Sequence, residues 1–237
     1  PSVPLLPAVL ALGEKLGRSG REVTEAFVLG FEVQAKVGKA IGEQHYALGW
    51  HATSTLGTLG AAAACARLLR LDAGRTQAAL AAAASLASGL QQNFGTMTKP
   101  LHAGWAARNG VVAASLAQRG LTADVRALEG GSGQTPARVG GFLRAMSGGA
   151  EIDPSVAVTA LGQPWDIVSP GIGVKLYPCC YATHRAIDAA LEIYERGRVP
   201  PAQVERVVAI VSPGTLLPLI SRAPETGLEA KFSLQYC

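Results

Sequence analysis

The chain has 237 residues, of which 49% are hydrophobic and 16% charged, and its formal net charge is +4. This length and composition suit a large buried core and exclude a disordered chain. The sequence has no basic stripe interleaved with aromatic residues, which argues against nucleic-acid binding, and no uninterrupted apolar run long enough to span a membrane.

The remaining composition favours close helix packing. Aromatic residues make up only 5% of the chain, so alanine, leucine, valine and glycine must build the core. The four cysteines show no CxxC metal pattern, which predicts reduced thiols in a cytoplasmic protein without a bound metal. Because the chain starts at Pro1, ends within "KFSLQYC" and shows no signal peptide, we expect a part of a longer protein.

Five long helices are expected in the first two thirds of the chain, from the spacing of their apolar residues. They cover residues 4–17, 19–42, 56–70, 71–89 and 104–118. Ser19 is the expected N-cap of the second helix, and the fourth should begin near Asp72. Residues 128–154 are rich in glycine and polar side chains, which predicts a surface loop with one short helix near 137–146.

The pattern changes in the last third of the chain. A helix is expected over residues 184–196, and the alternating "VERVVAIVSP" predicts a strand over 204–213. The break should fall near residues 162–171. The sequence therefore predicts a mainly α fold, with an all-helical domain at 1–166 and the start of a smaller α/β lid domain at 167–237.

All four histidines, His45, His51, His102 and His184, lie at or near expected helix boundaries. Helix starts present unpaired N–H groups and a positive dipole end, where anions bind readily. His51 and the cluster Thr53-Ser54-Thr55 directly precede an alanine-rich helix. This arrangement fits an ordinary N-cap and, equally, a general acid or base that faces a bound anion.

The stretch "NFGTMTKPLHAGWAARNG" places Lys99 and His102 around Pro100, between two very apolar runs. Proline suits the first turn of a helix, so Lys99 should lie at the entrance and His102 in the first turn. A lysine in apolar surroundings either pairs with an anion or has a lowered pKa. The structural alternative is a lysine whose charged end extends to solvent.

Two further windows gather polar residues. "GVKLYPCCYATHRAIDAA" crowds Lys175, Cys179, Cys180 and His184 before a helix, which fits either a linker with a Thr cap or a Cys–His nucleophilic pair. "EAKFSLQYC" carries Lys231 and Tyr236 and indicates little by itself.

In these windows the chain resembles the MmgE/PrpD family, which includes 2-methylcitrate dehydratases, cis-aconitate decarboxylases and iminodisuccinate epimerases. The matching stretches are "GWHATSTLGTLGAAAA", "GTMTKPLHAGWAARNG", "KLYPCCYATHRAIDA" and "EAKFSLQY". The resemblance implies a helical domain with a smaller α/β lid, a homodimer and an active site between the two domains. It also implies chemistry without a cofactor on a small di- or tricarboxylate.

The resemblance also assigns residues by motif position. It implies catalytic roles for His51, His102, His184 and Tyr236, and substrate-binding roles for Thr98, Lys99, Lys175 and Cys180. Lys99 and Lys175 would hold carboxylates while a histidine or tyrosine removes a proton beside one, and the identity of that base stays open.

The sequence departs from the family at two places. The family's Asp and His just upstream of "PSVPLLPA" would precede Pro1, and the decarboxylases carry a histidine where this chain has Cys180. The sequence therefore predicts a lyase, first of the 2-methylcitrate dehydratase type. The alternatives are an epimerase or cis-aconitate decarboxylase of the same family, or a non-catalytic carboxylate-binding protein.

Overall fold

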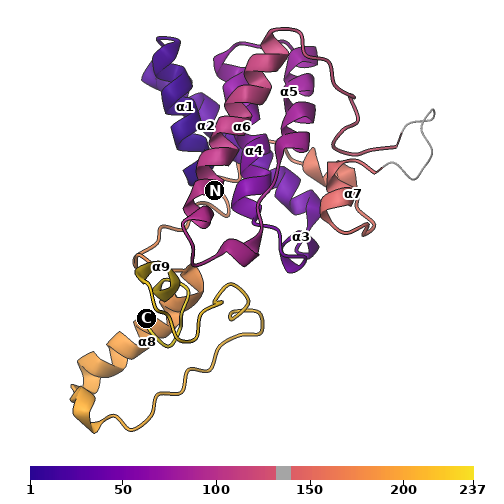
Figure 1. Cartoon of the computed structure of the whole chain (residues 1–237). Helices are drawn as coiled ribbons and strands as arrows, with labels where there is room; N and C mark the ends of the chain where they lie inside the picture. The colour runs from indigo at the N-terminus through magenta and orange to yellow at the C-terminus, as the bar shows by residue number, and fades with distance from the viewer. Residues whose placement is uncertain (132–139) are drawn as a thin grey trace. The chain divides into compact units, whose positions relative to one another are not determined.

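The computed structural model describes residues 1–131 and 140–237. The protein is mainly helical, as the sequence predicted, and Figure 1 traces its helices in chain order. It divides into two compact units, the first formed by residues 1–90 and 100–172, the second by residues 91–99 and 173–237. Within the described ranges, no helix has the length and apolar character that crossing a membrane requires.

The first unit contains most of the helices. They are α1 (Ser2–Lys15), α2 (Gly20–Ile41), α3 (Gln44–Ala47), α4 (Ala52–Leu68), α5 (Ala73–Leu86), most of α6 (Thr98–Gln118), α7 (Phe142–Met146) and a 3-10 turn, η2 (Pro154–Ala157). The second unit has η1 (Gln91–Asn93), α8 (Tyr181–Gly197), η3 (Pro201–Gln203) and α9 (Gly227–Ala230). The short helix expected near 137–146 is observed as α7, while residues 132–139 lie outside the described ranges.

Side-chain caps fix the starts of two helices where the sequence predicted them. The Ser19 hydroxyl accepts the Glu22 N–H and the Glu22 carboxylate accepts the Ser19 N–H, which is a complete capping box before α2. Asp72 accepts the Arg75 N–H at 2.8 Å before α5. In contrast, α4 begins at Ala52, earlier than predicted. The helix α6 begins at Thr98, before the expected residue 104 but in agreement with the helix start predicted around Pro100.

Small residues allow α4 to lie at the centre of the first unit. A Cβ built on Gly30 of α2 would lie 2.6 Å from the Gly60 carbonyl oxygen of α4. A Cβ built on Gly110 of α6 would lie 2.4 Å from the Ala61 Cβ of α4. Side chains at these positions would therefore force the helices apart, and glycine makes the close contact possible.

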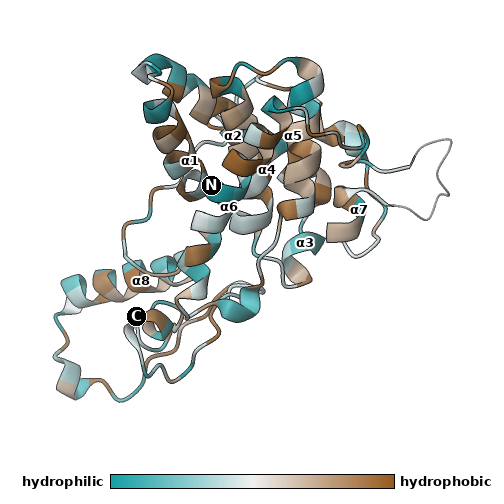
Figure 2. Cartoon of the chain, turned by 45° about the horizontal axis from the view of Figure 1, so that its top comes forward, coloured by the Kyte–Doolittle hydropathy of each residue, from teal (hydrophilic) through white to brown (hydrophobic). Residues whose placement is uncertain are grey.

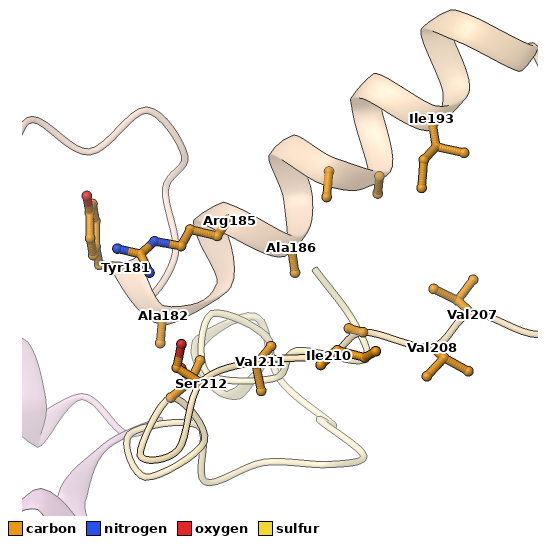
Figure 3. Close-up of a pocket in the computed structure, with 14 residues that line it drawn as sticks. Tyr181, Ala182, Arg185, Ala186, Ile193, Val207, Val208, Ile210, Val211 and Ser212 are labelled. Atoms are coloured by element: carbon orange, nitrogen blue, oxygen red, sulfur yellow. The ribbon is translucent and has the colours of Figure 1, made fainter.

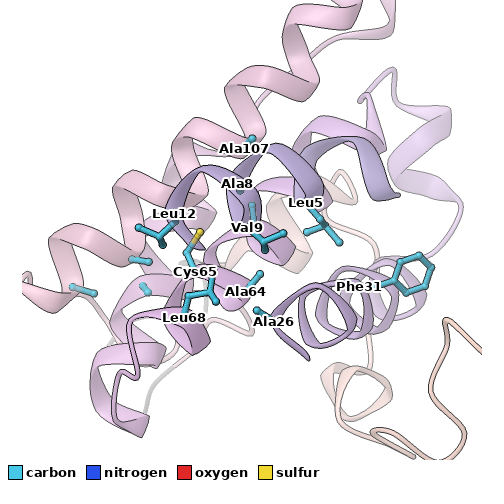
Figure 4. Close-up of a cluster of buried hydrophobic side chains, with 14 residues drawn as sticks. Leu5, Ala8, Val9, Leu12, Ala26, Phe31, Ala64, Cys65, Leu68 and Ala107 are labelled. Carbon is cyan, nitrogen blue, oxygen red and sulfur yellow. The ribbon is translucent and has the colours of Figure 1, made fainter. Parts of the chain in front are cut away.

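Two apolar clusters form the core of the first unit. In Figure 4, side chains of α1 and α2 meet Ala64, Cys65 and Leu68 of α4. The second cluster joins Leu59 of α4 to Phe142 and Leu143 of α7. Burying each large aliphatic side chain contributes roughly 1.5–3 kcal/mol. Figure 2 shows the hydrophobic and neutral colours that dominate α4 and α5.

Buried charges tie residues 162–166 to α2. The Glu32 carboxylate accepts the N–H groups of Gly162 at 2.9 Å and Asp166 at 2.8 Å. Lys36 lies 3.6 Å from Glu32 and 3.4 Å from Asp166, and Lys39 also binds Asp166. Burial raises the pKa of Asp166, but the hydrogen bonds and charges of Lys39 and Lys36 outweigh it and hold that pKa below its usual value.

The strand predicted over residues 204–213 is wrong for the described part of the chain. These residues run alongside α8 and leave an apolar groove of about 420 Å³, in which Ala186 and Ile193 point toward the segment of Val208 and Ile210 (Figure 3). No backbone hydrogen bond joins residues 205–211 to another described residue. A β-strand needs a paired neighbour, and residues 204–211 have none among the described residues.

Candidate active site

In the first unit, two histidines predicted from separate windows lie in contact. The Nδ1 atoms of His51 and His102 are 3.0 Å apart, and their ring centroids are separated by 5.2 Å. Both side chains are buried, with 6% and 3% exposed. One Nδ1 must carry a hydrogen and donate it, and the other Nδ1 must be unprotonated and accept the hydrogen bond. When both rings are neutral, their Nε2 atoms are therefore of opposite kinds, one a base and the other an acid.

Backbone hydrogen bonds fix the position of His51 at the start of α4. Its N–H donates to the Gly89 carbonyl at 2.9 Å, and its carbonyl accepts the Ser54 N–H at 2.8 Å and the Thr55 N–H at 3.2 Å. His51 is thus the N-cap residue of α4, although no side-chain hydrogen bond caps the helix.

Gly89 lets the chain pass close to the histidine pair. Its φ is +126°, a conformation that side chains disfavour. A Cβ at this position would lie 2.7 Å from the Ser54 Cβ and 3.6 Å from the His102 ring. The Ser54 hydroxyl donates to the His102 carbonyl at 3.3 Å, so these small residues hold both histidines in place.

In the second unit, the ammonium group of Lys99 lies over two aromatic rings. Its Nζ is 4.8 Å from the Phe232 ring centroid and 5.4 Å from that of Phe94. Burial, followed by the positive charges of Lys175 and Lys231, lowers the pKa of Lys99, and the charge of Cys180 partly offsets this. The lysine is half-buried rather than extended to solvent.

Two further lysines of the second unit, Lys175 and Lys231, lie close enough to Lys99 for their charges to lower its pKa. The Lys231 carbonyl accepts the Cys180 N–H at 2.8 Å, and Lys175 Nζ donates to the Cys179 carbonyl at 3.3 Å. Lys99, Lys175 and Lys231 form no ion pair with any carboxylate of residues 1–131 and 140–237. We call these three residues the lysine cluster. Because none of its ammonium groups is paired with a described carboxylate, the cluster suits an anionic ligand.

Within the described ranges no hydrogen bond joins a cysteine thiol to a histidine, so the nucleophilic Cys–His pair that the sequence left open stays a prediction. The Thr183 hydroxyl donates to the Cys180 carbonyl at 2.8 Å, so it accepts the Cys179 thiol hydrogen at 3.0 Å. The Cys179 thiol therefore contacts Thr183, four residues along the chain, at 3.0 Å. All four cysteines are free.

The other predicted site residues of the second unit make fewer specific contacts. His184 is 5% exposed and lies 5.1 Å from the Tyr177 and Tyr181 ring centroids, and its Nε2 has no hydrogen-bond partner among the described residues. Thr98 is half-buried at the start of α6. Tyr236 is 70% exposed. Their proposed roles therefore depend on the resemblance more than on contacts.

The sequence did not indicate the aromatic pair under Lys99 or the effect of the Lys231 charge on the pKa of Lys99. Phe94 and Phe232 are 138 positions apart in the chain, yet their ring centroids lie 5.5 Å from each other. Only the position of each within a matching window could have suggested them. Within the described ranges, no group of three or more His, Cys, Asp or Glu side chains could hold a metal ion.

Comparison with known proteins decides the family. The MmgE/PrpD N-terminal domain model matches residues 1–157, and the C-terminal domain model matches residues 177–237. The chain belongs to the MmgE/PrpD family.

Curated MmgE/PrpD relatives are named cis-aconitate decarboxylases. The human protein is 32% identical over 247 residues, covering 100% of this chain and 48% of its own length. The protein from Aspergillus terreus is 33% identical over 207 residues, covering 83% of this chain and 40% of its own. The chain thus spans about half the length of the curated relatives it matches.

Proposed function

We propose that the protein is a lyase that needs no cofactor and acts on a small di- or tricarboxylate, with cis-aconitate as the first substrate to test. The observation that carries this proposal is the lysine cluster. Three ammonium groups without a carboxylate partner match a substrate with several carboxylates. The names of the curated relatives direct the choice to cis-aconitate.

The histidine pair supports the chemical step. Decarboxylation breaks a carbon–carbon bond, releases CO₂ and leaves an electron pair on the remaining fragment, which an acid must protonate. The protonated Nε2 of the His51–His102 pair is suited to this. The lysine cluster would bind the carboxylates that remain, because holding the departing one would stabilise the ground state.

A hydro-lyase of the 2-methylcitrate dehydratase type is the second candidate, and Cys180 favours it. The resemblance places a histidine at this position in the decarboxylases, and this chain has a thiol. Dehydration needs a base to remove a proton and an acid to protonate the leaving hydroxide, and the pair of opposite tautomers supplies both kinds of nitrogen.

The test is a screen of the intact protein against cis-aconitate, 2-methylcitrate, citrate and iminodisuccinate, followed by NMR. Release of CO₂ supports the decarboxylase, and loss of water supports the dehydratase. Deuterium exchange without either loss supports an epimerase. Tight binding by calorimetry without turnover would mean a carboxylate-binding protein instead.

The assembly and location of the protein are also proposals. The family resemblance supports a homodimer, which light scattering of the intact protein tests through its mass. Reduced cysteines support a cytoplasmic location, which cell fractionation tests.

A further inference from the structure

His45 is the histidine to which neither the sequence nor the proposed chemistry gives a role. It lies in α3, is 1% exposed and uses both ring nitrogens. Its Nδ1 lies 3.0 Å from the Met146 carbonyl oxygen, and its Nε2 lies 2.7 Å from the Thr55 hydroxyl oxygen. A fully engaged, buried imidazole indicates a specific requirement for histidine at this position.

The protonation of His45 follows from its partners. A carbonyl oxygen can only accept, so Nδ1 must carry a hydrogen. Burial lowers the pKa of His45, although the Met146 carbonyl raises it, so the neutral ring is favoured. In that tautomer Nε2 is an acceptor, and the Thr55 hydroxyl must donate to it. The 3.4 Å contact of this hydroxyl with the His51 carbonyl is then not a second donated bond.

These contacts reach residues on both sides of His51 in the sequence. Thr55 lies in the first turn of α4 and its N–H binds the His51 carbonyl at 3.2 Å. On the other side, the Trp50 ring stacks on His45, with centroids 6.3 Å apart and an interplanar angle of 10°. His45 therefore contacts Trp50 before His51 and Thr55 after it.

We propose that His45 is a positioning residue for the His51–His102 pair and that it acts through Thr55. The hydrogen bond between the two Nδ1 atoms is 3.0 Å long, and such bonds weaken steeply when the distance increases or the angle changes. A small shift of the first turn of α4 would break it. The role in catalysis depends on the proposed function, whereas the role in pair geometry does not.

The test compares conservative changes on one face of α4 in the intact protein. Thr55→Val keeps the shape and removes the hydroxyl that donates to His45, and Thr55→Ser restores it. The matched control is Thr58→Val, because the buried Thr58 hydroxyl donates to the Ser54 carbonyl of its own helix at 2.8 Å and, among the described residues, to no other group. His45→Phe is the complementary variant, since it keeps a ring beside Trp50.

Two quantities are measured on each folded variant, the ¹⁵N signals of the His51 and His102 rings and the steady-state kinetics. We expect Thr55→Val and His45→Phe to shift both sets of ring signals and to lower kcat about ten- to a hundredfold with little change in KM. Thr55→Ser should restore both, and Thr58→Val should change neither.

The inference is overturned if the ¹⁵N ring signals of Thr55→Val and Thr58→Val are the same as those of the wild type. It is also overturned if the two valine variants shift these signals by the same amount. If His45→Phe does not fold, the threonine series decides alone. Absence of turnover in the wild type would contradict the proposed function only, because the ¹⁵N spectra still report whether His45 positions the pair.

Discussion

Replacing Lys99 by methionine separates a substrate-binding lysine from a structural one. Methionine keeps an apolar stem between Phe94 and Phe232 and removes the charge, which lies 5.4 Å and 4.8 Å from their ring centroids. Loss of the cation–π contacts costs about 0.5–1 kcal/mol. Relief of the repulsion from Lys175 and Lys231 acts in the opposite direction. The melting temperature should therefore change by only a few degrees, roughly 4 °C or less.

The effect on catalysis should be much larger. If Lys99 binds a substrate carboxylate in a partly buried site, its loss leaves that anion unpaired and costs about 3–5 kcal/mol. At about 1.4 kcal/mol per decade, kcat/KM should fall at least a hundredfold. The assay is steady-state decarboxylation or dehydration by the intact protein, with the melting temperature measured on the same sample.

The control is Lys15→Met, which removes an exposed lysine from the end of α1. It should leave kcat/KM unchanged. A Lys99→Met variant with kcat/KM near that of the wild type would refute the substrate-binding role. A fall in activity that only follows a large fall in melting temperature would refute it equally.

Three further outcomes follow from the same structure. Gly89→Ala should lower the melting temperature by the equivalent of about 1–3 kcal/mol, because its φ is +126° and the new Cβ would lie 2.7 Å from that of Ser54; unchanged calorimetric melting would contradict this. Because the pKa of Lys99 lies below the usual value of about 10.4, the Kd for a carboxylate should rise with pH before an ordinary lysine deprotonates, and calorimetry that shows a constant Kd from neutral pH to pH ~10 would disagree. Asp166 has a folded pKa below its unfolded value of about 3.9, so its stabilisation is present above that pH and lost as pH falls through the folded pKa. Urea unfolding of Asp166→Asn should therefore show a weaker acid dependence than the wild type, and identical pH curves would show that Asp166 does not contribute.

Local signals in the sequence were sufficient for most helices. The Ser19 and Asp72 caps are side-chain contacts within four residues, so the starts of α2 and α5 were predictable. No side chain caps α4 at His51, and its start was predicted four residues late. The predicted strand at 204–213 had the correct alternation but no partner among the described residues, which the pattern of one segment cannot reveal.

The sequence was sufficient to predict the individual residues of the candidate site, but not the contacts between them. His51 and His102 were each singled out at helix boundaries, but their 3.0 Å contact joins residues 51 positions apart. The lysine cluster likewise combines three separate windows of the sequence. His45 depends on Met146, 101 positions away, and no local pattern indicates that hydrogen bond. Tertiary packing produces all three arrangements.

The most direct test of the central claim is turnover of cis-aconitate by the intact protein, followed by ¹H NMR with detection of CO₂. We predict saturable conversion that Lys99→Met reduces at least about a hundredfold. If neither cis-aconitate nor any other polycarboxylate in the screen is converted, the result contradicts the proposal that this MmgE/PrpD protein is a polycarboxylate lyase.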